Sequence, residues 1–307
     1  MKFTLQNNSD QTIGLKRFLN QQGISHRMYH ELRATNDYVF INDIKIPFGS
    51  EVPAQATVTI DLPAEEADAS VAVSKQPLMV LMEDENWLVV DKPVGLTSVP
   101  GPSNRADTLV NRVKGHWQDI NSDNLVPHII TRLDRDTSGV VLVARHRLAN
   151  SLANMMQENH DINKSYVAIV SGTGLDDHGM IDAPLAKNPA GYNQIITETG
   201  KPAQTEYWKM EELTDATIVK VKLHTGRTHQ IRAHFQSINH PLLGDELYGG
   251  KKVMVIKHQA LHAYQLEFVD PFSGQQINMI SPLPEDLKQY LATQKIQPKP
   301  LMAKLTK

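Results

Sequence analysis

An acidic stretch divides this 307-residue chain into two unequal parts. Residues 61–85 contain seven carboxylates and one lysine, and residues 64–70 have little apolar content and no strand pattern. A segment of this composition buries too little apolar surface to fold by itself, which favours a flexible tether over a helical turn. We therefore predict a small unit over residues 1–62, a linker over residues 63–77 and a main domain over residues 78–290.

The small unit has the pattern of two short helices followed by small strands. Apolar residues recur at helical spacing before and after Ser25, which can cap the second helix. Asn42-Asp43 can form a tight turn between two extended runs that begin at Tyr38 and Ile44. So small a unit buries only a modest core, which favours an accessory module over a catalytic body.

The main domain alternates extended and helical segments without a regular βαβ period. Residues 87–90 and 140–144 are short apolar runs typical of buried strands, and a helical pattern covers residues 148–156. Residues 219–223 alternate apolar and polar side chains, as a half-buried antiparallel strand does. This mixture predicts an α+β fold with a large mixed or antiparallel sheet flanked by helices. Residues 291–307 carry four lysines and no acid, so we expect a solvated basic tail.

The composition narrows the possible functions. The chain has no cysteine, which excludes disulfides, thiolate metal sites, a cysteine nucleophile and the zinc-dependent nucleobase deaminases. The longest apolar runs are far shorter than the roughly 20 residues of a membrane helix. The first ten residues lack the apolar core of a signal peptide. We therefore expect a cytoplasmic protein without membrane contact, and a monomer as the default oligomeric state.

Two carboxylates and two guanidiniums occur between Arg132 and Asp136, directly before a predicted buried strand. If this run is extended, Arg132 and Asp134 point the same way, because the strand period is two. The guanidiniums of Arg132 and Arg135 would then lower the pKa of Asp134, which suits a nucleophile or an electrostatic stabiliser. A charged turn at the start of a strand, with Gly139 supplying backbone freedom, explains the pattern equally well.

A second basic segment covers residues 220–240, with four formal positive charges, four histidines and no acid. Thr228 can cap a helix whose apolar face includes Ile231. The free N–H groups of such a helix start, together with Arg227 and Arg232, would make an anion site. An ordinary amphipathic helix with a solvated basic face is the alternative. The histidine spacing does not match a His-Glu-x-x-His metal motif.

A single aromatic residue, Tyr166, lies in the extended run over residues 164–170. A tyrosine on a strand usually packs within the sheet. Beside a carboxylate, its ring would also be a platform on which a base can stack.

Together these segments resemble the RluA-type pseudouridine synthases, which isomerise uridine in RNA. The Arg-Leu-Asp-x-x-Thr-Ser-Gly signature of that family is matched at residues 132–139. Further matches, in the family's order, are Asp91-Lys92-Pro93-x-Gly95, Lys164-Ser165-Tyr166, residues 226–232, residues 240–245, Leu261-His262-Ala263 and residues 281–284. The resemblance covers residues 78–288, and residues 13–62 are similar, more weakly, to the small α-L RNA-binding module. Thr131 and Val99 stand where the family often has histidine.

The resemblance implies the pseudouridine synthase fold and three catalytic roles. Asp134 would be the essential catalytic carboxylate, acting at the ribose anomeric carbon or in the proton chemistry. Tyr166 would stack on the flipped base and assist at carbon 5, and Arg232 would pair with Asp134 and keep it ionised.

The resemblance also implies three residues that bind substrate and one partner, RNA. Arg132 would fill the gap that the extruded nucleotide leaves, Ile231 would line an apolar wall, and Arg227 would contact the RNA. The isomerisation leaves the composition of the RNA unchanged, so no redox cofactor, ATP or metal is implied. RNA-binding proteins usually carry excess positive charge, and the net charge of this chain is −3. Residues 220–240 nevertheless supply a local basic segment. Ribosomal and transfer RNA both remain candidates.

Two other functions compete with this interpretation. A glycoside hydrolase could use Asp134 and Asp136 as its carboxylate pair, since their Cα atoms would be roughly 7 Å apart in an extended chain. A catalytically inactive RNA-binding or ribosome-assembly factor would have lost its active site, whereas Asp134, Tyr166 and Arg232 are all intact.

Overall fold

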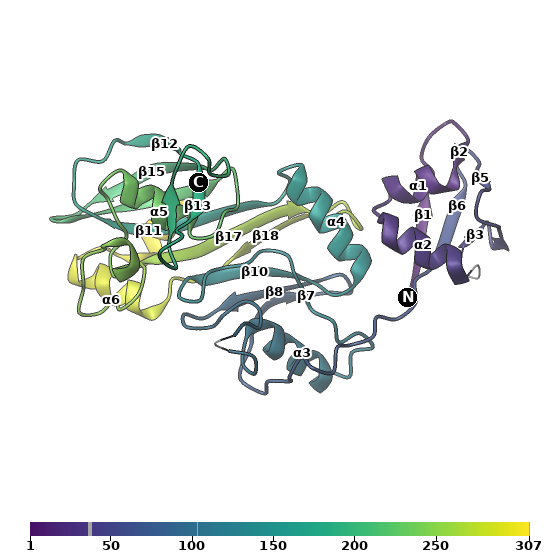
Figure 1. Ribbon diagram of the computed structural model, residues 1–307, viewed down its shortest axis with the longest axis horizontal. Coiled ribbons are helices and arrows are strands. Elements are labelled where there is room, and N and C mark those ends of the chain that lie inside the picture. Colours follow the sequence, from purple (N-terminus) through teal and green to yellow (C-terminus); the bar gives the residue numbers. More distant parts are fainter. Residues whose placement is uncertain (36–38, 103, 307) are drawn as a thin grey trace.

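The computed structural model of the protein describes residues 1–35, 39–102 and 104–306. A small N-terminal module lies beside one end of a larger domain that is built around one long, twisted sheet (Figure 1). In the part of the chain that the structure describes, no helix is long and apolar enough to cross a membrane.

The N-terminal module has two short helices packed on a small antiparallel sheet with strand order β1-β6-β3-β4. Its elements are β1 (Lys2–Gln6), β2 (Ile13–Gly14), α1 (Leu15–Gln21), α2 (His26–Thr35), β3 (Val39–Ile41), β4 (Ile44–Lys45), β5 (Glu51–Val52) and β6 (Thr57–Asp61). The Ser25 hydroxyl accepts a hydrogen bond from the Met28 N–H (3.3 Å), as expected of a cap. Asn42 and Asp43 both have positive φ, as a tight hairpin turn requires. Tyr38 lies outside the described residues.

The module contacts the main domain through α4 (Arg147–Glu158). Leu148 of α4 is fully buried within the apolar cluster of the module, and Leu152 packs against the same cluster. The Arg147 guanidinium forms an ion pair with Glu31 of α2. The module is therefore anchored by both an apolar contact and a charged contact.

The linker over residues 63–77 has no helix or strand, but the main domain holds it along its length. The Glu65 carboxylate accepts hydrogen bonds from the Arg147 N–H and the Asn124 amide (3.0 Å each), and it pairs with His128 (3.0 Å). The Lys114 ammonium donates to two linker carbonyls. The prediction of a flexible tether is therefore wrong, because these polar groups fix a segment that buries little apolar surface.

The main domain is an α+β fold with a mixed sheet flanked by helices, as the sequence predicted. The main sheet has the strand order β12-β15-β16-β11-β17-β10-β8-β7, with β18 paired to β17 and β9 to β10. Its pairs are antiparallel except β10 with β17. The strands are β7 (Met79–Glu83), β8 (Trp87–Lys92), β9 (His128–Ile129), β10 (Ser138–Ala144), β11 (Asn163–Ser171), β12 (His178–Asp182), β15 (Gln204–Glu212), β16 (Ala216–Leu223), β17 (Leu261–Val269) and β18 (Gln276–Ile280). A separate hairpin is formed by β13 (Leu185–Lys187) and β14 (Gln194–Ile196).

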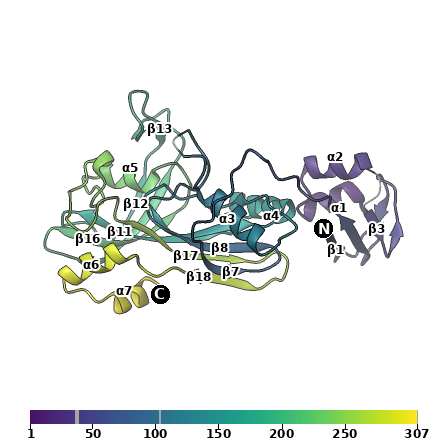
Figure 2. The same ribbon diagram turned by 90° about the horizontal axis from the view of Figure 1, so that it is seen from below.

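Alternating side chains divide the core between the two faces of the sheet. Tyr166, Ala168 and Val170 of β11 join a cluster with the helices α3 (Leu109–Asp119) and α5 (Gln230–Ser237). Val167 and Ile169 point to the other face, which α6 (Glu285–Thr293) and α7 (Pro298–Leu305) cover. Figure 2 shows α5 above the sheet and the last two helices below it. Tyr166 therefore faces the same side as α5.

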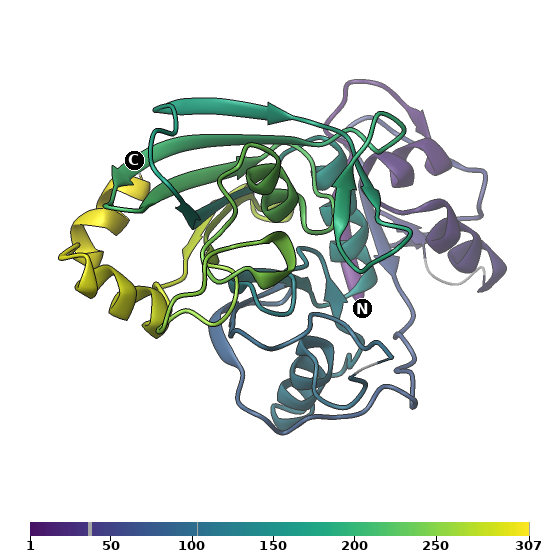
Figure 3. The same cartoon turned by 60° about the vertical axis from the view of Figure 1, so that its left-hand side comes forward.

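The C-terminal residues pack against the domain instead of forming a solvated tail. Leu301 and Leu305 of α7 are buried, and the Tyr264 hydroxyl donates a hydrogen bond to the Leu305 carbonyl (2.6 Å). Figure 3 shows α6 and α7 at the end of the sheet distant from the N-terminal module. The prediction for residues 291–307 is wrong. It considered the charge of this segment and not its apolar residues at helical spacing, which form a buried stripe.

Candidate active site

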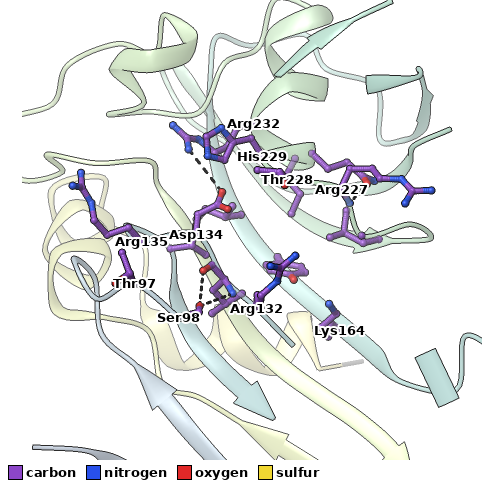
Figure 4. Close-up of a pocket in the computed structure, with 18 of the residues that line it drawn as sticks. Thr97, Ser98, Arg132, Asp134, Arg135, Lys164, Arg227, Thr228, His229 and Arg232 are labelled. Atoms are coloured by element: carbon purple, nitrogen blue, oxygen red, sulfur yellow. Dashed lines mark hydrogen bonds and ion pairs between the residues drawn. The ribbon is translucent and has the colours of Figure 1, made fainter. Parts of the chain in front are cut away.

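A cavity of about 410 Å³ opens between the loop before β10, the strand β11 and the start of α5 (Figure 4). These three segments are far apart in the sequence, and the sheet brings them together. The cavity is lined by all six residues that the sequence singled out: Arg132, Asp134, Tyr166, Arg227, Ile231 and Arg232.

Asp134 lies in a tight loop that leads into β10. The Thr137 N–H donates to the Asp134 carbonyl (3.1 Å), which closes a turn directly before the strand. The Ser98 hydroxyl donates to the Leu133 carbonyl (2.7 Å) and accepts from the Leu133 N–H (3.2 Å). The carboxylate is 28% exposed and lies 3.8 Å from Arg232 Nη1. The loop thus presents a partly exposed carboxylate to the cavity, with one guanidinium beside it.

The structure corrects two expectations about the neighbours of Asp134. Arg135 binds Asp136 through Nε and Nη2, one edge of its guanidinium, at 2.9–3.1 Å, and points away from Asp134 (Figure 4). Because the chain turns at residues 135–136, Asp134 and Asp136 do not lie on one extended strand, and Asp136 does not line the cavity. Of the two carboxylates proposed for a hydrolase, Asp134 lines the cavity and Asp136 does not.

Lys92 supports this loop through hydrogen bonds to backbone carbonyls. Its side chain is fully buried, and its ammonium donates to the carbonyls of Pro93, Leu96 and Arg135 at 2.7–3.0 Å. Burial lowers the pKa of Lys92 to about 7, although the carboxylates of Asp134 and Asp136 favour its charged form. Sequence reasoning matched Lys92 within a motif but gave it no role.

Tyr166 lies beneath the cavity on β11, with 3% of its surface exposed. Burial raises the pKa of its hydroxyl, and the negative charge of Asp134 raises it further, so the phenol stays neutral. Ile231 and Leu261 line the cavity with it. Burial also lowers the pKa of Lys164 to about 8 at the same wall. The result is an aromatic and apolar floor beside one carboxylate.

The start of α5 differs from the prediction. Thr228 does not cap the helix: the N-cap is His229, which has φ 53° and makes no side-chain capping bond. This left-handed residue turns the chain so that Arg232 points toward Asp134 (Figure 4). Arg227 is exposed and donates to the Pro202 carbonyl (3.0 Å) at the mouth of the cavity.

Arg232 has a closer partner than Asp134. Its Nε and Nη2 each lie 2.7 Å from the carboxylate of Asp245, which is 2% exposed. Its guanidinium carbon lies 4.9 Å from the ring centre of Tyr248, in the 3-10 helix η1 (Glu246–Tyr248). The sequence analysis assigned no role to Asp245 or Tyr248, although Asp245 ends a matched motif. An acid that follows a basic segment is a signal for an ion pair.

Comparisons with known proteins agree with this geometry. The sequence pattern described as RNA pseudouridylate synthase matches residues 86–237. An uncharacterized RNA pseudouridine synthase of Bacillus subtilis is 32% identical over 278 residues, which is 90% of this chain and 98% of that protein. This chain belongs to the RNA pseudouridine synthase family, within its RluA type.

Another relative supports the same assignment, and a solved structure has the same fold. The ribosomal large subunit pseudouridine synthase D of Nitrosomonas europaea is 39% identical over 72% of this chain and 67% of that protein. The solved structure of human RNA pseudouridylate synthase domain containing 4 has a TM-score of 0.61 at 19% identity, and it covers 71% of this chain and 94% of that one. The synthase is therefore an isomerase that acts on RNA.

Proposed function

We propose that this synthase converts a uridine of large-subunit ribosomal RNA to pseudouridine, with Asp134 as its catalytic carboxylate. The observation that carries the proposal is the single cavity that contains Asp134, Tyr166 and Arg232. The choice of RNA rests on the relatives named ribosomal large subunit pseudouridine synthase D, from three bacteria, at 37–39% identity.

The proposed roles follow from the positions of the side chains. The reaction breaks the bond between N1 of uracil and the ribose, turns the base, and joins carbon 5 to the same ribose carbon. Carbon 5 loses its proton and N1 gains one, so the composition is unchanged. The Asp134 carboxylate, partly exposed and held on a fixed loop, would act on the sugar or on its protons. Arg232 would supply a positive charge beside this carboxylate. The neutral ring of Tyr166 and the side chain of Ile231 would hold the flipped base.

The entrance of the cavity is basic. Arg132 and Arg227 line it, and both are exposed. Guanidinium groups bind phosphate oxygens and stack on bases, so these two side chains suit RNA at the entrance. Arg132 lies on the same loop as Asp134 and lines the same cavity, so we assign it the space that an extruded nucleotide would leave.

Pseudouridine mapping of total RNA tests the choice of substrate. In cells that lack this synthase, we expect loss of pseudouridine at one or a few positions of large-subunit ribosomal RNA. The purified protein should restore the same positions on RNA from those cells. Loss and restoration confined to transfer RNA would contradict the ribosomal assignment.

Replacing Arg132 separates base extrusion from chemistry. Because unstacking a paired base costs a few kcal/mol, Arg132→Ala should slow modification of a structured RNA about 30-fold and of a flexible single strand only about threefold. Single-turnover rates on both RNAs measure the difference. Arg135→Ala is the matched control, because it removes the same charge from a side chain of the same loop that pairs with Asp136 and points away from Asp134 (Figure 4). Its effect should be small and equal on both RNAs, and equal losses from Arg132→Ala would contradict the extrusion role.

A further inference from the structure

The guanidinium of Arg232 is fixed by a residue other than its catalytic neighbour. The bidentate contact with Asp245 occupies Nε and Nη2, so only Nη1 is left to face Asp134, at 3.8 Å. A two-point contact fixes the plane of a guanidinium as well as its position. At 3.8 Å, Nη1 supplies positive charge to Asp134 without binding the carboxylate oxygen tightly. That oxygen therefore stays available for reaction.

Tyr248 adds a third contact to Arg232. The cation lies 4.9 Å from the ring centre, and both side chains are largely buried, which strengthens a cation–π interaction. Burial raises the pKa of Tyr248 to about 12, so its hydroxyl remains protonated. Arg232 is thus held at its edge by Asp245 and across its face by Tyr248.

The hydroxyl of Tyr248 points to another element. It accepts a hydrogen bond from the Gln194 N–H (2.7 Å), on β14, and it bonds His229 Nδ1 (3.1 Å), at the start of α5. Tyr248 also packs with Leu185 of β13 in a small apolar cluster. One side chain therefore joins the β13–β14 hairpin to the residue that faces Asp134.

The hairpin is an exposed projection on the side of the sheet that carries the cavity (Figure 2). The hairpin is not part of the main sheet. Among the described residues, its two strands form backbone pairs with each other and with Lys201. Tyr192 lies in the loop that connects the two strands of the hairpin, and it is 89% exposed. An exposed ring stacks on unpaired bases without regard to their identity. A projection with such a ring at its tip suits an RNA strand that enters the cavity.

We propose that Tyr248 is a positioning residue with two separable parts. Its ring holds Arg232 for the reaction, and its hydroxyl holds the β13–β14 hairpin, which contacts the RNA through Tyr192. The proposal rests on the proposed catalytic role of Asp134. It assigns Tyr248 no contact with the substrate.

Two substitutions separate the ring from the hydroxyl. Tyr248→Phe keeps the ring and loses the hydroxyl, so KM for RNA should rise about fivefold while kcat falls less than threefold, as for one lost hydrogen bond. Tyr248→Leu also loses the ring, and kcat should fall about 30-fold, as for one buried cation–π contact. Steady-state initial rates over a range of RNA concentrations give both constants. Tyr264→Phe is the matched control, because it removes a buried hydroxyl bonded to backbone on the opposite face of the sheet.

Tyr192→Ala tests the path through the hairpin. It should raise KM as Tyr248→Phe does, and the double variant should be no worse than the more affected single variant, because both changes disable the same contact. Additive effects, or an unchanged KM in Tyr248→Phe, would overturn the role of the hydroxyl. A kcat in Tyr248→Leu equal to that of Tyr248→Phe would overturn the role of the ring. If Tyr248→Leu does not fold, as judged by its thermal transition, the KM and kcat of Tyr248→Phe and the double variant decide.

Asp134→Asn, measured in the same series, separates the two proposals. If that variant is active, the proposed function fails. If it is inactive while the Tyr248 variants match the Tyr264→Phe control, only the inference about Tyr248 fails.

Discussion

Asp134→Asn is expected to abolish pseudouridine formation, with a rate loss on the order of 10⁴-fold or more, as when a reacting group is removed. Asparagine keeps nearly the same shape, but it carries no charge and is a poor nucleophile. The loop should keep its fold, because Ser98 and Lys92 hold it through backbone groups and not through the carboxylate. RNA affinity should change little, because phosphate contacts supply most of it.

Asp136→Asn is the matched control for this prediction. Asp136 lies two residues away, binds Arg135 and does not line the cavity. We therefore expect it to retain most of its turnover. Pseudouridine formed in a native RNA pool, with RNA binding measured in parallel, compares the two variants. If Asp134→Asn forms as much pseudouridine as the wild-type protein, the mechanism is contradicted. Equal inactivation by both substitutions would restore the paired-carboxylate hypothesis.

Gly139→Ala is expected to destabilise β10, the strand that follows the catalytic loop. Gly139 has φ +116°, and a Cβ there would lie 2.1 Å from the Ala263 carbonyl oxygen, in the one parallel pair of the main sheet. Both the positive φ and the close approach of the Ala263 backbone exclude a side chain at this position. We expect a loss of at least about 3 kcal/mol in unfolding free energy, and a fall of roughly 6–12 °C in Tm. Differential scanning calorimetry measures the change.

Gly274→Ala separates the two causes of that loss. Gly274 also has positive φ (+72°), but nothing lies within 4 Å of a Cβ built there. We expect only the backbone cost, about 1 kcal/mol. If Gly139→Ala costs no more than Gly274→Ala, the close approach to Ala263 is not a real constraint.

Local patterns in the sequence were sufficient for several strands of the main sheet. The apolar runs over residues 87–90 and 140–144 fall within β8 and β10, and the alternation over residues 219–223 falls within β16. Side-chain period and turn residues are properties of neighbours in the chain, so they can be predicted from the sequence. The resemblance then brought residues of three distant segments into one predicted site.

The choice of partner for each charge could not be predicted in this way. Arg135 was expected to act on Asp134, but it binds Asp136, because the turn at residues 135–136 directs it outward. Arg232 was expected to pair with Asp134, but Asp245 is its closer partner. An ion pair depends on distances of a few ångströms, which spacing along a chain does not fix.

The sequence by itself determined the fold class, the family and six of the residues that line the cavity. These depend on side-chain periodicity and on motifs that can be read along the chain. Only the tertiary structure decided that Lys92 supports the loop, that α7 covers one face of the sheet, and that Tyr248 joins the hairpin to Arg232. Each of these depends on burial and on contacts between segments far apart in the sequence, which exist only after the sheet has formed.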